Sequence, residues 1–178
     1  TLDRSSAASD VYKRQERKIN TTPDATIEEK NVALQKLEQI FNQANEAINQ
    51  AQTNQDVEDR RQQAIEQINM TLPETVVKNN ARKNIEAEAN QRDNVINSNG
   101  ESTLEEKDAA KQLVAQAKNQ ALQNIDQAQT NQDVNNAVTN GNQEIQQIVP
   151  ETIVKTNARQ SLLLSLIHIS EPTRRRGI

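Results

Sequence analysis

Apolar side chains recur along the chain at the spacing of amphipathic helices. Leu37, Phe41, Ala44, Ile48 and Ala51 follow one another at intervals of four, three, four and three residues. Such intervals place side chains along one stripe of an α-helix, whereas a half-buried strand alternates with a period of two. We expect this stripe to face a helical core, with Phe41 filling that core rather than serving as an exposed ligand anchor.

Two further stripes follow the first, and all three recur later in the chain. The pattern therefore predicts an all-α protein with short connections between its helices. The second stripe is Val57, Ala64, Ile65 and Ile68, and the third is Val77, Ala81, Ile85 and Ala89. The predicted helices span residues 27–51, 55–69, 73–97, 104–128, 132–147 and 150–163.

Residues typical of helix ends flank these stripes. Thr26 and Glu29 have the spacing of a capping box, in which each side chain accepts a hydrogen bond from the other residue's amide. Pro73 is expected in the first turn of the third helix, where a missing N–H is tolerated. Gly100 is expected to end that helix in a left-handed conformation. The other start signals are Thr53 with Asp56, Thr103 with Glu106, Thr130 with Asp133, and Pro150.

These signals belong to an internal repeat of 77 residues. Residues 51–57, AQTNQDV, recur letter for letter as 128–134, and LPETVVK at 72–78 recurs as VPETIVK at 149–155. Each repeat supplies three antiparallel helices, so its entry and exit lie at opposite ends. The predicted fold is a series of tandem three-helix-bundle repeats, arranged end to end as an elongated rod.

Both ends of the chain depart from the repeat. SSAASDVYKRQ at 5–15 and LSLIHISEPTR at 164–174 resemble in-frame translations of the two adapter arms used in transposase-tagged DNA libraries. Translated adapters carry no information on fold or function. The predicted organisation is 1–15 adapter-derived, 16–23 the tail of a preceding repeat, 24–100 a first repeat, 101–163 a second repeat truncated in its third helix, and 164–178 adapter-derived.

Setting the adapter segments aside removes several candidate functional groups. His168, the only histidine, lies in one of them, as do Tyr12 and the basic run at 174–176. The apolar run at 161–169 is too short to cross a membrane, which takes about 20 residues. We therefore expect no imidazole base, no basic nucleic-acid patch and no membrane insertion.

Charge and composition narrow the function further. Residues 16–160 hold 15 of the 21 Lys and Arg residues and 22 of the 25 acidic residues, a net charge of −7. An acidic chain repels phosphate backbones, which disfavours nucleic-acid binding. The absence of cysteine excludes disulfides and thiol chemistry. We predict no catalytic, cofactor-binding or metal-binding residues.

Three motifs have simpler structural interpretations. The adjacent acids Glu28 and Glu29, repeated at 105–106, do not face each other on a helix and favour its positive N-terminal dipole. LPET at 72–75 resembles the sortase signal LPxTG, but Val76 replaces the glycine, so we interpret it as a helix start. Gly141 is expected to weaken its helix by about 0.5–1 kcal/mol relative to Ala, where Lys or Glu would suit better, and to make that helix fray first.

The segments EEKNVALQKLEQIFNQANEAINQAQTNQDV and LPETVVKNNARKNIEAEANQRDNVINSNGESTLEEKDAA resemble a repeat of unknown function from staphylococcal cell-wall-anchored surface proteins. Repeats of this type occur in the methicillin-resistance surface protein, a related aggregation protein and the giant extracellular-matrix-binding protein. The resemblance implies an extracellular, peptidoglycan-anchored stalk connected with adhesion, cell aggregation and biofilm. It carries over no catalytic residue and no cofactor.

Several functions remain open at this point. The first is a structural stalk, and the second is a helical module that binds a host matrix or serum protein, or a like array on a neighbouring cell. An enzyme is disfavoured because the repeats lack His, Cys, Trp, Tyr and any Gly-rich phosphate loop. A disordered spacer ranks below a helical one, because caps and apolar stripes agree in both copies.

Overall fold

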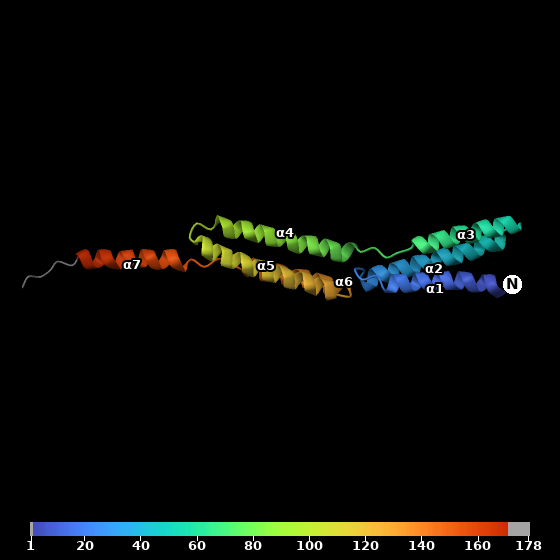
Figure 1. Ribbon diagram of the computed structural model, residues 1–178, viewed down its shortest axis with the longest axis horizontal. Helices are drawn as coiled ribbons and strands as arrows, with labels where there is room; N and C mark the ends of the chain where they lie inside the picture. The colour runs from blue at the N-terminus through green and yellow to red at the C-terminus, as the bar shows by residue number, and fades with distance from the viewer. Residues whose placement is uncertain (1, 171–178) are drawn as a thin grey trace, which may run out of the picture. The chain divides into compact units, whose positions relative to one another are not determined.

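In the computed structural model, residues 2–170 are described, with side chains from residue 10 to 169. They form seven helices and contain no strand, which confirms the all-α class (Figure 1). The predicted adapter residues 171–178, and the side chains of residues 5–9, lie outside the described part. The helices are α1 (Leu2–Asn20), α2 (Ile27–Gln50), α3 (Asn54–Met70), α4 (Val76–Ser98), α5 (Leu104–Gln127), α6 (Asn131–Gln147) and α7 (Ile153–Ser170).

The predicted capping signals account for where four of these helices begin. Thr26 Oγ1 accepts a hydrogen bond from the amide of Glu29 at 3.3 Å, and Glu29 Oε2 accepts one from the amide of Thr26 at 2.9 Å. This reciprocal capping box recurs at the start of α5. At α3, Thr53 Oγ1 accepts from the amide of Asp56 at 3.1 Å. The same arrangement begins α6. Each cap satisfies amides that have no partner inside the helix.

The chain divides into two compact units, and the boundary between them passes through α4, α5 and α6. One unit comprises residues up to Lys83 together with Asn124–Ala137. The other comprises Asn84–Gln123 together with the residues from Val138 onward.

In the first unit, α1, α2 and α3 pack against one another. Their core contains Ile19, Leu37 and Ile68, all almost fully buried. Gln15 of α1 is also buried, and its Nε2 donates to the carbonyl oxygen of Thr71 at 2.6 Å. This group of three therefore joins the helix before the first complete sequence repeat to the first two helices of that repeat.

The second unit shows the same grouping one repeat later. Ile85 of α4 and Ala121 of α5 both lie against Gly141 of α6. Arg92 Nε of α4 donates to the carbonyl of Ile148, 77 residues after the Gln15–Thr71 pair. Helices therefore pack as the third helix of one sequence repeat with the first two of the next, whereas the sequence suggested packing within a repeat.

Two predicted helix boundaries are wrong. The helix expected to start at Pro73 starts at Val76, and its counterpart after Pro150 starts at Ile153, so both prolines lie in the connectors. Gly100 does not adopt a left-handed conformation, since no glycine in the described part of the chain has a positive φ. Instead Asn99 Oδ1 accepts a hydrogen bond from the amide of Glu101 at 2.8 Å, which shapes the turn.

The prediction for Gly141 is also wrong. A Cβ at this position would lie 2.5 Å from Cβ of Ala121 and 2.9 Å from Cδ1 of Ile85. Both distances are shorter than van der Waals contact, so the glycine permits the close approach of α6 to its neighbours. A Lys or Glu side chain does not fit at this buried position.

Phe41 occupies a less central place than expected. Its ring centroid lies 5.2 Å from that of Tyr12 on α1, at an interplanar angle of 61°. This edge-to-face geometry is favourable between aromatic rings. Phe41 is only partly buried, so it covers one side of the α1–α3 core instead of filling its centre.

Candidate functional site: the polar network at a helix junction

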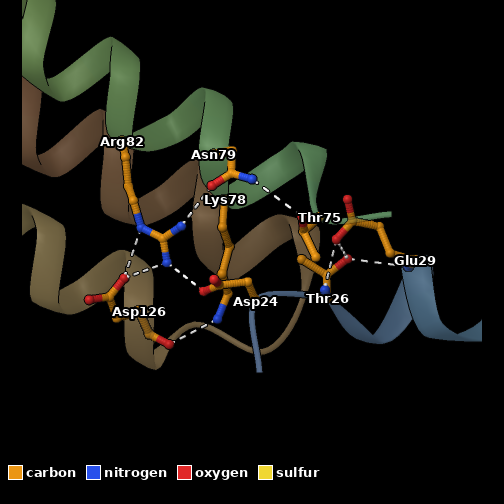
Figure 2. A network of polar contacts seen from close by, with 8 residues as sticks. All are labelled: Asp24, Thr26, Glu29, Thr75, Lys78, Asn79, Arg82 and Asp126. Carbon is orange, nitrogen blue, oxygen red and sulfur yellow. Dashed lines mark hydrogen bonds and ion pairs between the residues drawn. The ribbon is translucent and has the colours of Figure 1, made fainter. Parts of the chain in front are cut away.

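The most connected polar cluster in the first unit lies where the starts of α2 and α4 meet the end of α5 (Figure 2). We call it the junction network. Its side chains come from segments that are far apart in the sequence. The residues are Asp24, Thr26, Glu29, Thr75, Lys78, Asn79, Arg82 and Asp126.

Glu29 caps two helices at once. Its Oε2 accepts from the amide of Thr26 at the start of α2. Its Oε1 accepts from the amides of Val76 and Val77, at 2.9 and 3.1 Å, at the start of α4. The negative carboxylate thus meets two positive helix ends, which is favourable for both. This contact explains why α4 starts at Val76 and needs no proline in its first turn.

Arg82 connects two acidic side chains from different segments. Its Nη2 lies 2.6 Å from Oδ1 of Asp24 and 2.8 Å from Oδ1 of Asp126, and its Nε also donates to Asp126. Its Nη1 donates to Oδ1 of Asn79 at 3.0 Å, so the planar guanidinium is held on several sides. The hydrogen bonds to Asp24 and then Asp126 raise the pKa of Arg82, which keeps it charged.

The α5–α6 turn lies against the same junction. Lys78 is buried, and its Nζ donates to the carbonyl oxygen of Asp126 in the last turn of α5 at 2.8 Å. A cation at this end of a helix satisfies a free carbonyl and complements the helix dipole. The amide of Ile27 donates to the carbonyl of Gln129 at 2.9 Å. Glu28 Oε2 accepts from the amide of Asn131 at 2.9 Å.

Much of the network recurs in the second unit, 77 positions later. Glu106 Oε2 accepts from the amide of Thr103, and its Oε1 accepts from that of Val154 at 3.0 Å. These backbone hydrogen bonds lower the pKa of Glu106, that of Thr103 first and that of Val154 next. Lys155 Nζ donates to the carbonyl of Gly100 at 2.7 Å. Glu101, at the position of Asp24, pairs with Arg159, which lowers the pKa of Glu101.

The paired acids considered in the sequence are thus committed to backbone amides. A carboxylate with a lowered pKa, such as Glu106, stays ionised near neutral pH and is a poor proton donor. Among residues 10–169, no group of three His, Cys, Asp or Glu side chains is placed to hold a metal ion. His168 lies on an exposed face of α7.

The LPET motif forms the connector that leads into α4. Pro73 is buried, whereas Leu72 is 59% exposed. Beside this connector and the first turns of α2 lies a groove of about 330 Å³. A groove of about 300 Å³ recurs at the corresponding residues of the second unit, beside Val149 and the start of α5.

The sequence analysis identified Glu29 and Glu106 as caps but missed the roles of Lys78 and Arg82. Both residues recur, as Lys155 and Arg159, and that recurrence of charge was the available signal. Their partner Asp126 lies 44 positions or more away, so no local pattern connects them.

None of the described helices has both the length and the apolar character needed to cross a bilayer.

Comparison with known proteins identifies the repeat. A sequence profile described as "Domain of Unknown Function (DUF1542)" matches residues 6–76 and 77–153. The chain is 30% identical over 127 residues to the extracellular matrix-binding protein ebh of Staphylococcus aureus strain MRSA252. It is 30% identical over 142 residues to the extracellular matrix-binding protein EbhA of strain Newman. No solved structure matches the chain.

These alignments cover 71% and 78% of the chain, but only 1% and 4% of the two relatives. The resemblance drawn from the repeat residues is confirmed. The two profile matches meet between Val76 and Val77, so each contains one three-helix group, α1–α3 or α4–α6. The first match begins inside the segment predicted to be adapter-derived, and that origin stays a prediction.

Proposed function

Because the chain belongs to the DUF1542 family, we propose that it is a structural spacer, part of the stalk of a bacterial cell-surface protein that acts in adhesion, cell aggregation or biofilm. In this proposal the parent protein is extracellular and anchored to the cell wall. The chain itself performs no catalysis. Its function is to hold other parts of the parent protein at a distance from the cell.

The observation that carries this proposal is the double cap made by Glu29 and repeated by Glu106. Each carboxylate joins the start of one helix to the start of the next three-helix group's first helix. A contact of this kind restrains the connector between successive groups, which a spacer needs if it is to transmit length. With helices of about 24 residues and 1.5 Å per residue, each repeat would add roughly 40 Å to an array.

The surface chemistry supports the same role. Acidic, Asn- and Gln-rich helices stay hydrated and repel one another and nucleic acids. The two grooves beside the junctions are lined by acidic side chains and by short apolar ones, with no cluster suited to chemistry on a substrate.

The second candidate is a helical module that binds a host matrix or serum protein. The name shared by the relatives, extracellular matrix-binding protein, favours it. The chain spans a few per cent of those proteins at most, so that name describes molecules of which this segment is a small part.

Binding measurements separate the two candidates. The purified chain is passed over immobilised collagen, laminin and fibronectin, each tested singly. The spacer proposal predicts no saturable binding. Saturable binding that survives in the Leu164→Glu variant, in which one exposed apolar side chain is removed, would favour the binding module and overturn the spacer.

A further inference from the structure

α7 carries an apolar face that is covered in the corresponding helix of the preceding repeat. Every described side chain from Thr156 to Ile169 is exposed, including Leu162 at 67% and Leu166 at 63%. The residues 77 positions earlier on α4 are Ile85 and Ala89, which are 0% and 4% exposed. α7 thus presents the face with which α4 packs, but without a partner.

The repeat identifies what covers such a face. On α4 the covering helices are α5 and α6, which approach Ile85 through Ala121 and Gly141. Their counterparts 77 positions earlier are α2 and α3. In this chain α2 and α3 are covered by α1, which lies at the position in the repeat that α4 and α7 occupy later.

The polar groups at the start of α7 and α5 are left exposed in the same way. The Arg82 side chain, which holds Asp126 of the α5–α6 turn, is 25% exposed, whereas that of Arg159 is 60% exposed. Ile27, whose amide binds that turn, is 44% exposed, and its counterpart Leu104 is 75% exposed. The second junction thus has the residues that bind a turn, and they are more accessible.

A turn of the required sequence is present and exposed in the same chain. Residues 51–57 of the α2–α3 turn are identical to residues 128–134 of the α5–α6 turn. Thr53 and Asn54 are exposed, whereas Thr130 and Asn131 are partly buried at the junction. The docking contacts at Gln129 and Asn131 use backbone atoms, so the α2–α3 turn can make them equally well.

We propose that α7 of one molecule docks on the α2–α3 hairpin of a second copy, in the place of α1, and so links molecules head to tail. α7 is better equipped for this position than α1. At the positions of Lys78 and Arg82 it has Lys155 and Arg159, whereas α1 has Thr1 and Ser5. At the position of Ile85 it has a leucine, whereas α1 has an alanine.

The test is the self-association of the full chain, measured by sedimentation over a wide range of concentration. The mass is expected to rise from that of one chain, 20.0 kDa, toward multiples of it. Leu162→Glu places a carboxylate on the docking face and should weaken association about tenfold or more. Leu164→Glu is the matched control, because Leu164 is equally exposed but points about 200° away around the helix.

Both variants change exposed side chains of α7, so neither disturbs a folded core. Selective loss of association in Leu162→Glu supports the proposal. A chain that stays monomeric at every concentration overturns it. Equal loss in both variants also overturns it, because the association would then be unspecific contact between apolar side chains.

A disulfide trap reports the geometry independently, since the chain has no cysteine of its own. The amide of Ile27 bonds to the carbonyl of Gln129, and the equivalent intermolecular pair is Leu104 with Gln52. Mixing the Leu104→Cys and Gln52→Cys chains under mild oxidation should give a crosslinked heterodimer. Met70→Cys, at the other end of α3, should not crosslink with Leu104→Cys, and equal yields from both mixtures would contradict the docking.

Discussion

The amide nitrogen of Val76 donates a hydrogen bond of 2.9 Å to Oε1 of Glu29, 47 positions earlier in the chain. The other oxygen of the same carboxylate accepts from the amide of Thr26. Two helices therefore begin at a single side chain, and the arrangement is repeated at Glu106.

Replacing Glu29 should destabilise both helix starts together. Glu29→Ala leaves the amides of Thr26, Val76 and Val77 without their acceptor, and we expect a loss of about 2 kcal/mol in the free energy of unfolding. Glu46→Ala, on an exposed face of the same helix, is the control and should change stability little. Urea unfolding followed by circular dichroism measures both, and equal effects would show that the double cap has no special role.

Stability should also fall in acid because of Glu106. Its pKa in the folded chain lies below its ordinary value of 4.5, so the ionised form is favoured by folding. The contribution is complete above pH 4.5 and is lost as the pH falls through the lowered folded pKa. Thermal midpoints measured from neutral pH downward should drop in this range, and less so in Glu106→Gln. An unchanged acid dependence in that variant would exclude Glu106 as a source.

The two glycines outside the predicted adapter segments should respond oppositely to alanine. Gly141→Ala forces a Cβ against Ala121, and the overlap should cost about 1–3 kcal/mol, more than the roughly 1 kcal/mol gained in helix propensity. Gly100→Ala meets open space and has no positive φ to lose, so it should be neutral or slightly stabilising. Thermal unfolding of the two variants decides, and a stabilised Gly141→Ala would refute the close contact.

Sequence patterns predicted the helices whose ends are fixed locally. The capping boxes at Thr26 and Thr103 place the starts of α2 and α5 correctly, because both partners lie within four residues. The start of α4 was misplaced at Pro73 because its cap comes from Glu29, on another helix. Periodicity alone contains no record of such a contact.

Packing explains the other differences between expectation and structure. Helix propensity treats Gly141 as a weak point, but its lack of a Cβ is what lets α6 approach Ala121. The 77-residue period gives the length of the unit without its phase, so it did not show that α1 packs with α2 and α3. The junction role of Arg82 was missed because Asp24 and Asp126 reach it from distant segments.

Arg82 should matter more than its counterpart Arg159. Arg82→Met leaves Asp24 and Asp126 facing each other without a cation, and we expect a loss of about 0.5–1 kcal/mol at low salt. Arg159→Met removes one exposed pair with Glu101 and should have a smaller effect. Since salt screens such charges, the difference between the two variants should shrink at high ionic strength. Equal effects at low salt would contradict the bridging role.

The central claim is that the double-capped junction makes the repeat a spacer, and small-angle X-ray scattering of arrays with two, three and four copies of the 77-residue repeat tests it most directly. Dilute samples of the Leu162→Glu background keep self-association out of the measurement. The account predicts that the maximum dimension grows by a constant increment of about 40 Å per repeat, and that the increment shrinks when every junction glutamate is changed to alanine. A maximum dimension that levels off as repeats are added would contradict it.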